Sequence, residues 1–135
     1  MTQRDEIKLM LEAGCVYRYA GKFREAREIF YGVRALLPAQ EVADLALAGV
    51  FVDENKLDEA EAHCRRALQL NRTSAATFVQ MAEIQLLRKD VAGARQSLKE
   101  AMEIHPNDAV VFQIKTLSQL VSMLRLNGSS TVTGS

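Results

Sequence analysis

Apolar residues along the chain recur at intervals of three and four positions, which is the spacing that puts side chains on one face of an α-helix. Three short polar breaks, AGK at 20–22, ENK at 54–56 and RKD at 88–90, each separate two such apolar segments. The pattern therefore predicts an all-α fold of three tandem helical hairpins.

The same arrangement returns every 34 residues without an insertion or a deletion. The stretch GCVYRYAGKFREAREIF, at 14–30, aligns with 48–64 and with 82–98. Small residues occupy equivalent places midway along the first helix and early in the second: Gly14, Ala48 and Ala82, and Ala26, Ala60 and Ala94. Such residues let two helix backbones approach closely, while larger apolar groups fill the surrounding space. Each hairpin is expected to stack on its neighbours to bury its outer face.

The period and the residues at its key places resemble the tetratricopeptide repeat; in the first unit these residues are Gly14, Tyr17, Gly21, Ala26, Phe30 and Pro38. The resemblance implies a right-handed solenoid with repeats at about 7–40, 41–74 and 75–108. It also implies a binding scaffold and not an enzyme, because the family consists of scaffolds that serve many partners.

Several positions depart from the family's pattern. The aromatic residue early in the first helix is present as Phe78, but Met10 and Asp44 stand there in the first two repeats. Arg72 replaces the terminal proline of the second repeat, and Gln85 replaces a usual aromatic in the third. None of these departures removes a hairpin from the prediction.

The two ends of the chain carry their own signals. Thr2 and Asp5 resemble a capping box that starts the first helix. An amphipathic helix is expected over about 108–126, where it would cap the open end of the stack. Its apolar stripe comprises Val110, Ile114, Leu117, Val121 and Leu124. The Asn-Gly pair that follows is expected to end this helix, which leaves a single domain over 1–126 and a flexible tail at 127–135. Alternatively, the tail docks on the chain's own groove or on a neighbouring molecule.

Composition limits the classes of function. Seventeen basic residues balance seventeen acidic ones, so no net field attracts a nucleic acid. The two cysteines, Cys15 and Cys64, are too few for a disulfide framework and suit a reducing cytoplasm. The N-terminal stretch lacks the signal-peptide pattern, and no apolar run approaches the roughly 20 residues that span a bilayer. We expect a cytoplasmic protein without a membrane span.

Candidate chemistry is sparse. His63 and His105 are the only histidines, and neither belongs to a nucleophile or phosphate-binding motif. His63 and Cys64 are adjacent, so on a helix their side chains diverge by about 100° and do not converge on a metal ion. We interpret Cys64 as a core residue and His63 as solvated. The sequence predicts no catalytic residue, no metal site and no cofactor, and therefore no enzyme.

A basic cluster in the first repeat raises nucleic-acid binding as an alternative; its members are Arg18, Lys22, Arg24, Arg27 and Arg34. Glu25 and Glu28 interleave with the arginines at ion-pair spacing, which is typical of a solvated helix face. No nucleic-acid partner is predicted, and an RNA-binding helical repeat stays a distant alternative.

By the resemblance, the first helix of each hairpin lines a concave inner surface that receives partners. The residues that this assigns to a peptide-binding groove are Leu11, Cys15, Arg18, Tyr19, Val42, Leu45, Gly49, Val52, Val79, Glu83 and Leu86. The family's clamp for a C-terminal carboxylate needs lysine and asparagine where Leu11, Cys15 and Gly49 stand, so the clamp is predicted to be absent. The groove is instead apolar, with a floor kept low by Cys15 and Gly49. An alternative is that the middle first helix, LALAGVFV, is buried on every side.

These features predict a small adaptor or chaperone that shields an apolar peptide or helix of a partner protein. In size, repeat number and groove character the chain is similar to the tetratricopeptide chaperones of bacterial type III secretion. An alternative of another class is a structural assembly module that forms a homodimer through its groove or its tail.

Overall fold

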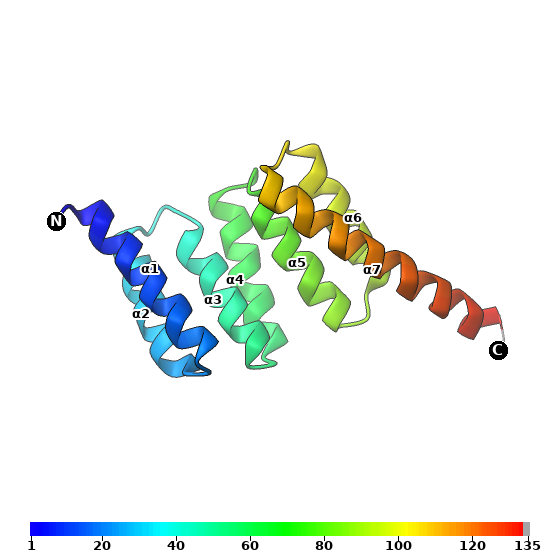
Figure 1. Cartoon of the computed structure of the whole chain (residues 1–135), viewed down its shortest axis with the longest axis horizontal. Coiled ribbons are helices and arrows are strands. Elements are labelled where there is room, and N and C mark those ends of the chain that lie inside the picture. Colours follow the sequence, from blue (N-terminus) through cyan, green and yellow to red (C-terminus); the bar gives the residue numbers. More distant parts are fainter. Residues whose placement is uncertain (134–135) are drawn as a thin grey trace. The chain divides into compact units, whose positions relative to one another are not determined.

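The computed structural model describes the backbone of residues 1–133 and the side chains of residues 1–124, and every regular element within that range is an α-helix (Figure 1). The helices are α1 (Gln3–Tyr19), α2 (Phe23–Leu36), α3 (Val42–Asp53), α4 (Leu57–Leu70), α5 (Ala75–Leu87), α6 (Val91–Glu103) and α7 (Asp108–Thr133). They pair as three hairpins, α1–α2, α3–α4 and α5–α6, followed by α7. The predicted all-α class, with three hairpins and a C-terminal helix, is confirmed.

The chain divides into two compact units, Met1–Arg72 and Thr73–Ser135. Unit 1 contains the first two hairpins, and unit 2 contains the third hairpin and α7. The single repeat domain expected over 1–126 stays a prediction.

The three polar breaks end the first helix of each hairpin in the same way. Each contains one residue in the left-handed region, and these residues are 34 positions apart: Gly21 (φ 77°), Asn55 (φ 59°) and Lys89 (φ 64°). The N–H of the residue after each of them donates, at 2.8 Å, to a carbonyl five residues earlier, as in a Schellman cap. Glycine takes this conformation without steric cost, whereas a lysine must be held there by the surrounding bonds.

The first hairpin is closed by a contact between Gly14 on α1 and Phe30 on α2. A Cβ built on Gly14 would lie only 2.3 Å from Cε1 of the Phe30 ring, and both residues are buried. The small residues expected at the helix contacts of the other hairpins are all fully buried: Ala48, Ala60, Ala82 and Ala94. Cys64 is likewise fully buried, as predicted for a core residue.

α7 packs on α6 and α5 of unit 2 (Figure 1). Residues of its predicted apolar stripe join the core cluster of that unit. Ile114 and Val121 are each 3% exposed, and Val110 and Leu117 pack against the same core cluster. Leu124, at the end of the stripe, is 37% exposed. None of the helices within the described residues has the length and apolar character needed to cross a membrane.

The start of α1 and the end of α7 can be compared with the helix ends that the sequence predicts. At the start, the Thr2 hydroxyl accepts from the Asp5 N–H at 3.1 Å and the Asp5 carboxylate accepts from the Thr2 N–H at 3.2 Å, so the capping box is confirmed. At the other end, α7 does not stop at the Asn-Gly pair but continues to Thr133. The reason is energetic: glycine costs a helix interior only about 1 kcal/mol relative to alanine, and no proline follows to block the next turn. Residues 134 and 135 lie outside the described part of the chain.

The two helical glycines of the first hairpin make a matched test of this packing. Gly14→Ala should lower the free energy of unfolding by about 1–3 kcal/mol, because its methyl group would overlap the Phe30 ring. Gly32→Ala should be neutral or raise it by up to about 1 kcal/mol, because the nearest atom, 3.1 Å away, is the flexible end of Met10. Urea denaturation followed by far-UV circular dichroism measures both. Equal effects of the two substitutions would contradict the assigned contact.

Candidate functional site

In unit 1 the predicted groove residues lie on the two first helices. α1 carries Leu11, Cys15, Arg18 and Tyr19, and α3 carries Val42, Leu45, Gly49 and Val52. Cys15 and Tyr19 are exposed, Gly49 is buried, and the other five are half-buried. Most of these side chains are therefore reachable from solvent within the unit.

Lys8, Leu11 and Val42 come together in a pocket of about 680 Å³ between the start of α1 and the start of α3. Its apolar lining comes from Ile7 and from Leu11, Leu37 and Val42, which pack against the core cluster of Ile7, Val33 and Ala43. Its remaining lining is polar and comes from Gln3, Arg4, Asp5 and Gln40. The lining of this pocket thus combines charged and apolar side chains.

Arg18 crosses from α1 to α3 and forms an ion pair with Asp53. Nε lies 2.5 Å from Oδ2 and Nη2 lies 3.2 Å from Oδ1, a bidentate arrangement. The hydrogen bond to Asp53 raises the pKa of the Arg18 guanidinium above its usual value; burial opposes this shift, and the charges of Asp53, Tyr19 and Cys15 add to it.

The same guanidinium covers Gly49. A Cβ on Gly49 would lie 2.6 Å from Nη1 and 3.0 Å from Cζ of Arg18. The low floor expected at Gly49 is therefore wrong for this position, because the space left by the missing side chain is filled by Arg18. The sequence offered one signal for this contact, an acidic residue one helical turn after the glycine.

In unit 2 the predicted residues separate into core and surface. Val79 is 3% exposed and packs in the core cluster with Ala82 and Leu98. Its assignment to the groove is corrected, because α7 packs over α5 and closes this part of the unit. Glu83 and Leu86 are half-buried.

Glu83 and Leu86 line a second pocket, which we call the leucine pocket. It lies between α5 and α7, has a volume of about 320 Å³, and is otherwise lined by Leu87, Leu117, Leu120 and Leu124. Leu87 is 53% exposed and Leu120 is 43% exposed. Five leucines therefore surround one opening, with a single carboxylate beside them.

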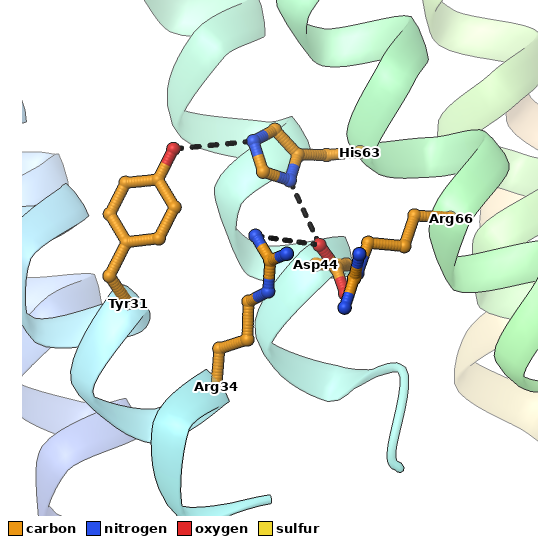
Figure 2. Close-up of polar contacts among 5 residues, drawn as sticks. All are labelled: Tyr31, Arg34, Asp44, His63 and Arg66. Carbon is orange, nitrogen blue, oxygen red and sulfur yellow. Dashed lines mark hydrogen bonds and ion pairs between the residues drawn. The ribbon is translucent and has the colours of Figure 1, made fainter. Parts of the chain in front are cut away.

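Asp44 is a buried carboxylate in the core of unit 1, at the place where the repeat usually has an aromatic residue. It is 0% exposed. His63 Nδ1 lies 2.9 Å from its Oδ1, and Arg66 Nε donates to its Oδ2 at 3.1 Å (Figure 2). Arg34 forms a longer ion pair at 3.9 Å, and the Tyr31 hydroxyl lies 3.4 Å from His63 Nε2. Side chains from α2 and α4 thus converge on one carboxylate of α3.

The solvated histidine expected at position 63 is wrong. The His63 side chain is 14% exposed and stacks on Phe51, with ring centroids 5.3 Å apart and planes at 10°. The physical reason is that burial of a carboxylate costs free energy unless the carboxylate is hydrogen-bonded and paired. His63 is buried because it supplies one of these partners to Asp44. The signal in the sequence was an aspartate in a core position, which needs partners elsewhere.

Removing the carboxylate tests its structural role. Asp44→Ala should lower the free energy of unfolding by about 3 kcal/mol, because Arg34, His63 and Arg66 would lose their shared partner. This loss is at the low end for a buried pair because the side chains of Arg34 and Arg66 reach solvent. Glu59→Ala, at an exposed position of α4, should change stability by less than about 0.5 kcal/mol. Chemical denaturation of both variants measures the difference, and equal stabilities would rule out this role.

Comparison with known proteins identifies the repeat. A family model described as tetratricopeptide repeat matches residues 51–117. No curated protein matches the chain.

Solved structures with the same fold cover nearly the whole chain. The TPR2B domain of yeast Sti1, solved in a complex with pHsp70, has a TM-score of 0.76 at 19% identity over 89% of this chain and 96% of that chain. The type III secretion chaperone SycD of Yersinia enterocolitica, solved with a peptide of the translocator YopD, has a TM-score of 0.73 at 15% identity over 90% and 95%. The same chaperone in an alternative dimer gives 0.77 at 15% identity over 90% and 95%. At these identities the similarity establishes the fold.

Proposed function

The chain is a tetratricopeptide repeat protein, and from this we propose that it is a binding scaffold that receives an apolar segment of a partner protein on the inner faces of its first helices. The proposal includes a chaperone role, in which the chain shields that segment from water. It assigns no catalytic residue, metal or cofactor to the chain.

The leucine pocket is the observation that carries this proposal. Leu87 and Leu120 leave much of their surface in water beside Leu117 and Leu124, although Ile114 and Val121 of the α7 stripe are buried. An apolar side chain that enters would remove this surface from water, which is worth roughly 25 cal/mol per Å². Contiguous apolar surface of this kind marks sites of protein interaction.

The structural neighbours support a peptide as the partner. SycD was solved with a peptide of the translocator YopD, and TPR2B of Sti1 in a complex with pHsp70. In our chain Leu11, Cys15 and Gly49 stand where the carboxylate clamp would need lysine and asparagine, so we expect apolar contacts to dominate over recognition of a chain terminus. A chaperone of the type III secretion class fits this chemistry.

The basic cluster of the first repeat gives little support to a nucleic-acid partner. Its arginines are paired with carboxylates within unit 1: Arg18 with Asp53, Arg24 with Glu28, Arg27 with Glu54 and Arg34 with Asp44. A phosphate backbone would have to compete with these carboxylates for each guanidinium. A protein partner is therefore favoured.

Substitutions at the mouth of the leucine pocket test the proposal. The immobilised chain should enrich apolar peptides from a phage-displayed random library. The double variant Leu87→Asp/Leu120→Asp, which puts two charges into the lining of the pocket, should weaken binding of the selected peptides by at least about tenfold. Both residues are partly exposed, so helical circular dichroism should be unchanged. Gln113→Asp, an exposed position of α7, is the control and should bind normally. Failure of the wild-type chain to enrich any peptide would refute the proposal.

Self-association is a second candidate, favoured by the exposed face of α7. Phe112 is 72% exposed and Met123 is 62% exposed. The two residues are eleven positions apart, which is close to three turns of an α-helix, so they lie on the same side of α7. If this face forms a homodimer, light scattering after size exclusion should give twice the monomer mass, and Phe112→Ser with Met123→Ser should restore the monomer. A monomer at all concentrations would exclude this candidate.

A further inference from the structure

We propose that the Arg18–Asp53 pair makes the inner face of unit 1 selective against acidic side chains, so that the partner segment is apolar or neutral where it crosses this pair. This inference rests on the proposed function, since it concerns the same face of α1 and α3. It assigns Arg18, Asp53 and Gly49 a joint role in specificity.

The Arg18–Asp53 pair lies within reach of a partner. The side chains of Arg18 and Asp53 are 31% and 34% exposed. Cys15 and Tyr19, two exposed residues of the predicted groove, lie on the same helix, α1, three positions before and one position after Arg18. A segment bound along α1 would therefore meet the pair.

The charge of Arg18 is balanced within the chain. Asp53 occupies both Nε and Nη2 of Arg18, so the guanidinium is already neutralised by an internal carboxylate. A carboxylate from a partner would have to displace Asp53 or lie beside it, and it would lose its own hydration without gaining a free cation. A neutral or apolar side chain pays neither cost and can pack on the planar guanidinium.

Gly49 provides the space in which the pair lies. Nη1, Cζ and Nη2 of Arg18 would lie 2.6, 3.0 and 3.2 Å from a Cβ at this position, so the guanidinium rests on the glycine backbone. Any larger residue would push Arg18 out of its place beside Asp53. The selectivity can therefore be broken in two independent ways, by removing the charge of Asp53 or by filling the space at Gly49. Like specificity elsewhere, it depends on a penalty against the wrong partner as much as on attraction of the right one.

A positional glutamate scan tests the inference on the full chain. Peptides selected from the phage-displayed library are remade with each residue replaced in turn by glutamate and by glutamine, and their dissociation constants are measured by fluorescence anisotropy. On the wild-type chain we expect one position at which glutamate, but not glutamine, weakens binding by about tenfold. On Asp53→Asn that penalty should fall below about threefold or become a gain, because Arg18 is then an uncompensated cation.

Two further variants complete the experiment. Gly49→Ala, which displaces Arg18 without changing any charge, should relieve the glutamate penalty at the same peptide position. Glu59→Gln removes one negative charge from an exposed position of α4 and should leave the penalty unchanged. An equal glutamate penalty on the wild-type chain, Asp53→Asn and Gly49→Ala would overturn this inference while leaving the proposed function intact. If no peptide is selected at all, it is the proposed function that fails.

Discussion

The close approach of the two helices in each hairpin is the contact on which the other features of this protein depend. Gly14 has no room for a Cβ against Phe30, and Ala48 and Ala82 hold the equivalent buried places. Because the backbones lie close together, the surrounding apolar side chains reach across and form the core of each unit. Because the two helices of a hairpin lie so close together, the chain must reverse direction within a short connection. One residue of each break therefore takes a positive φ.

Within this regular core, Asp44 is the exception, and it changes what holds unit 1 together. An aromatic residue at this place would contribute a large apolar area to the core. The carboxylate instead collects His63 and Arg66 from α4 and Arg34 from α2 (Figure 2). Such a cluster often gives no more net stability than apolar packing of the same volume, but its directional bonds link α2, α3 and α4 through one carboxylate.

The features that the sequence predicts well are those encoded within one helix and its turn. The hairpins, the breaks, the capping box and the α7 stripe all follow from spacing over a few residues, which the 34-residue period repeats. The features it missed depend on distant partners. His63 is drawn inward by a carboxylate 19 positions earlier, and Arg18 fills a space 31 positions away at Gly49. Val79 is buried because α7 returns over α5.

In the proposed function, affinity and specificity come from different residues. The leucine pocket in unit 2 is apolar, and its five leucines can accept almost any apolar side chain. The Arg18–Asp53 pair in unit 1 contributes little attraction, since its charges already cancel, but it penalises an acidic neighbour. Each place disfavours its own class of side chain: polar side chains at the leucine pocket and acidic side chains at the ion pair. Because each property resides within one unit, each can be altered without disturbing the core of the other.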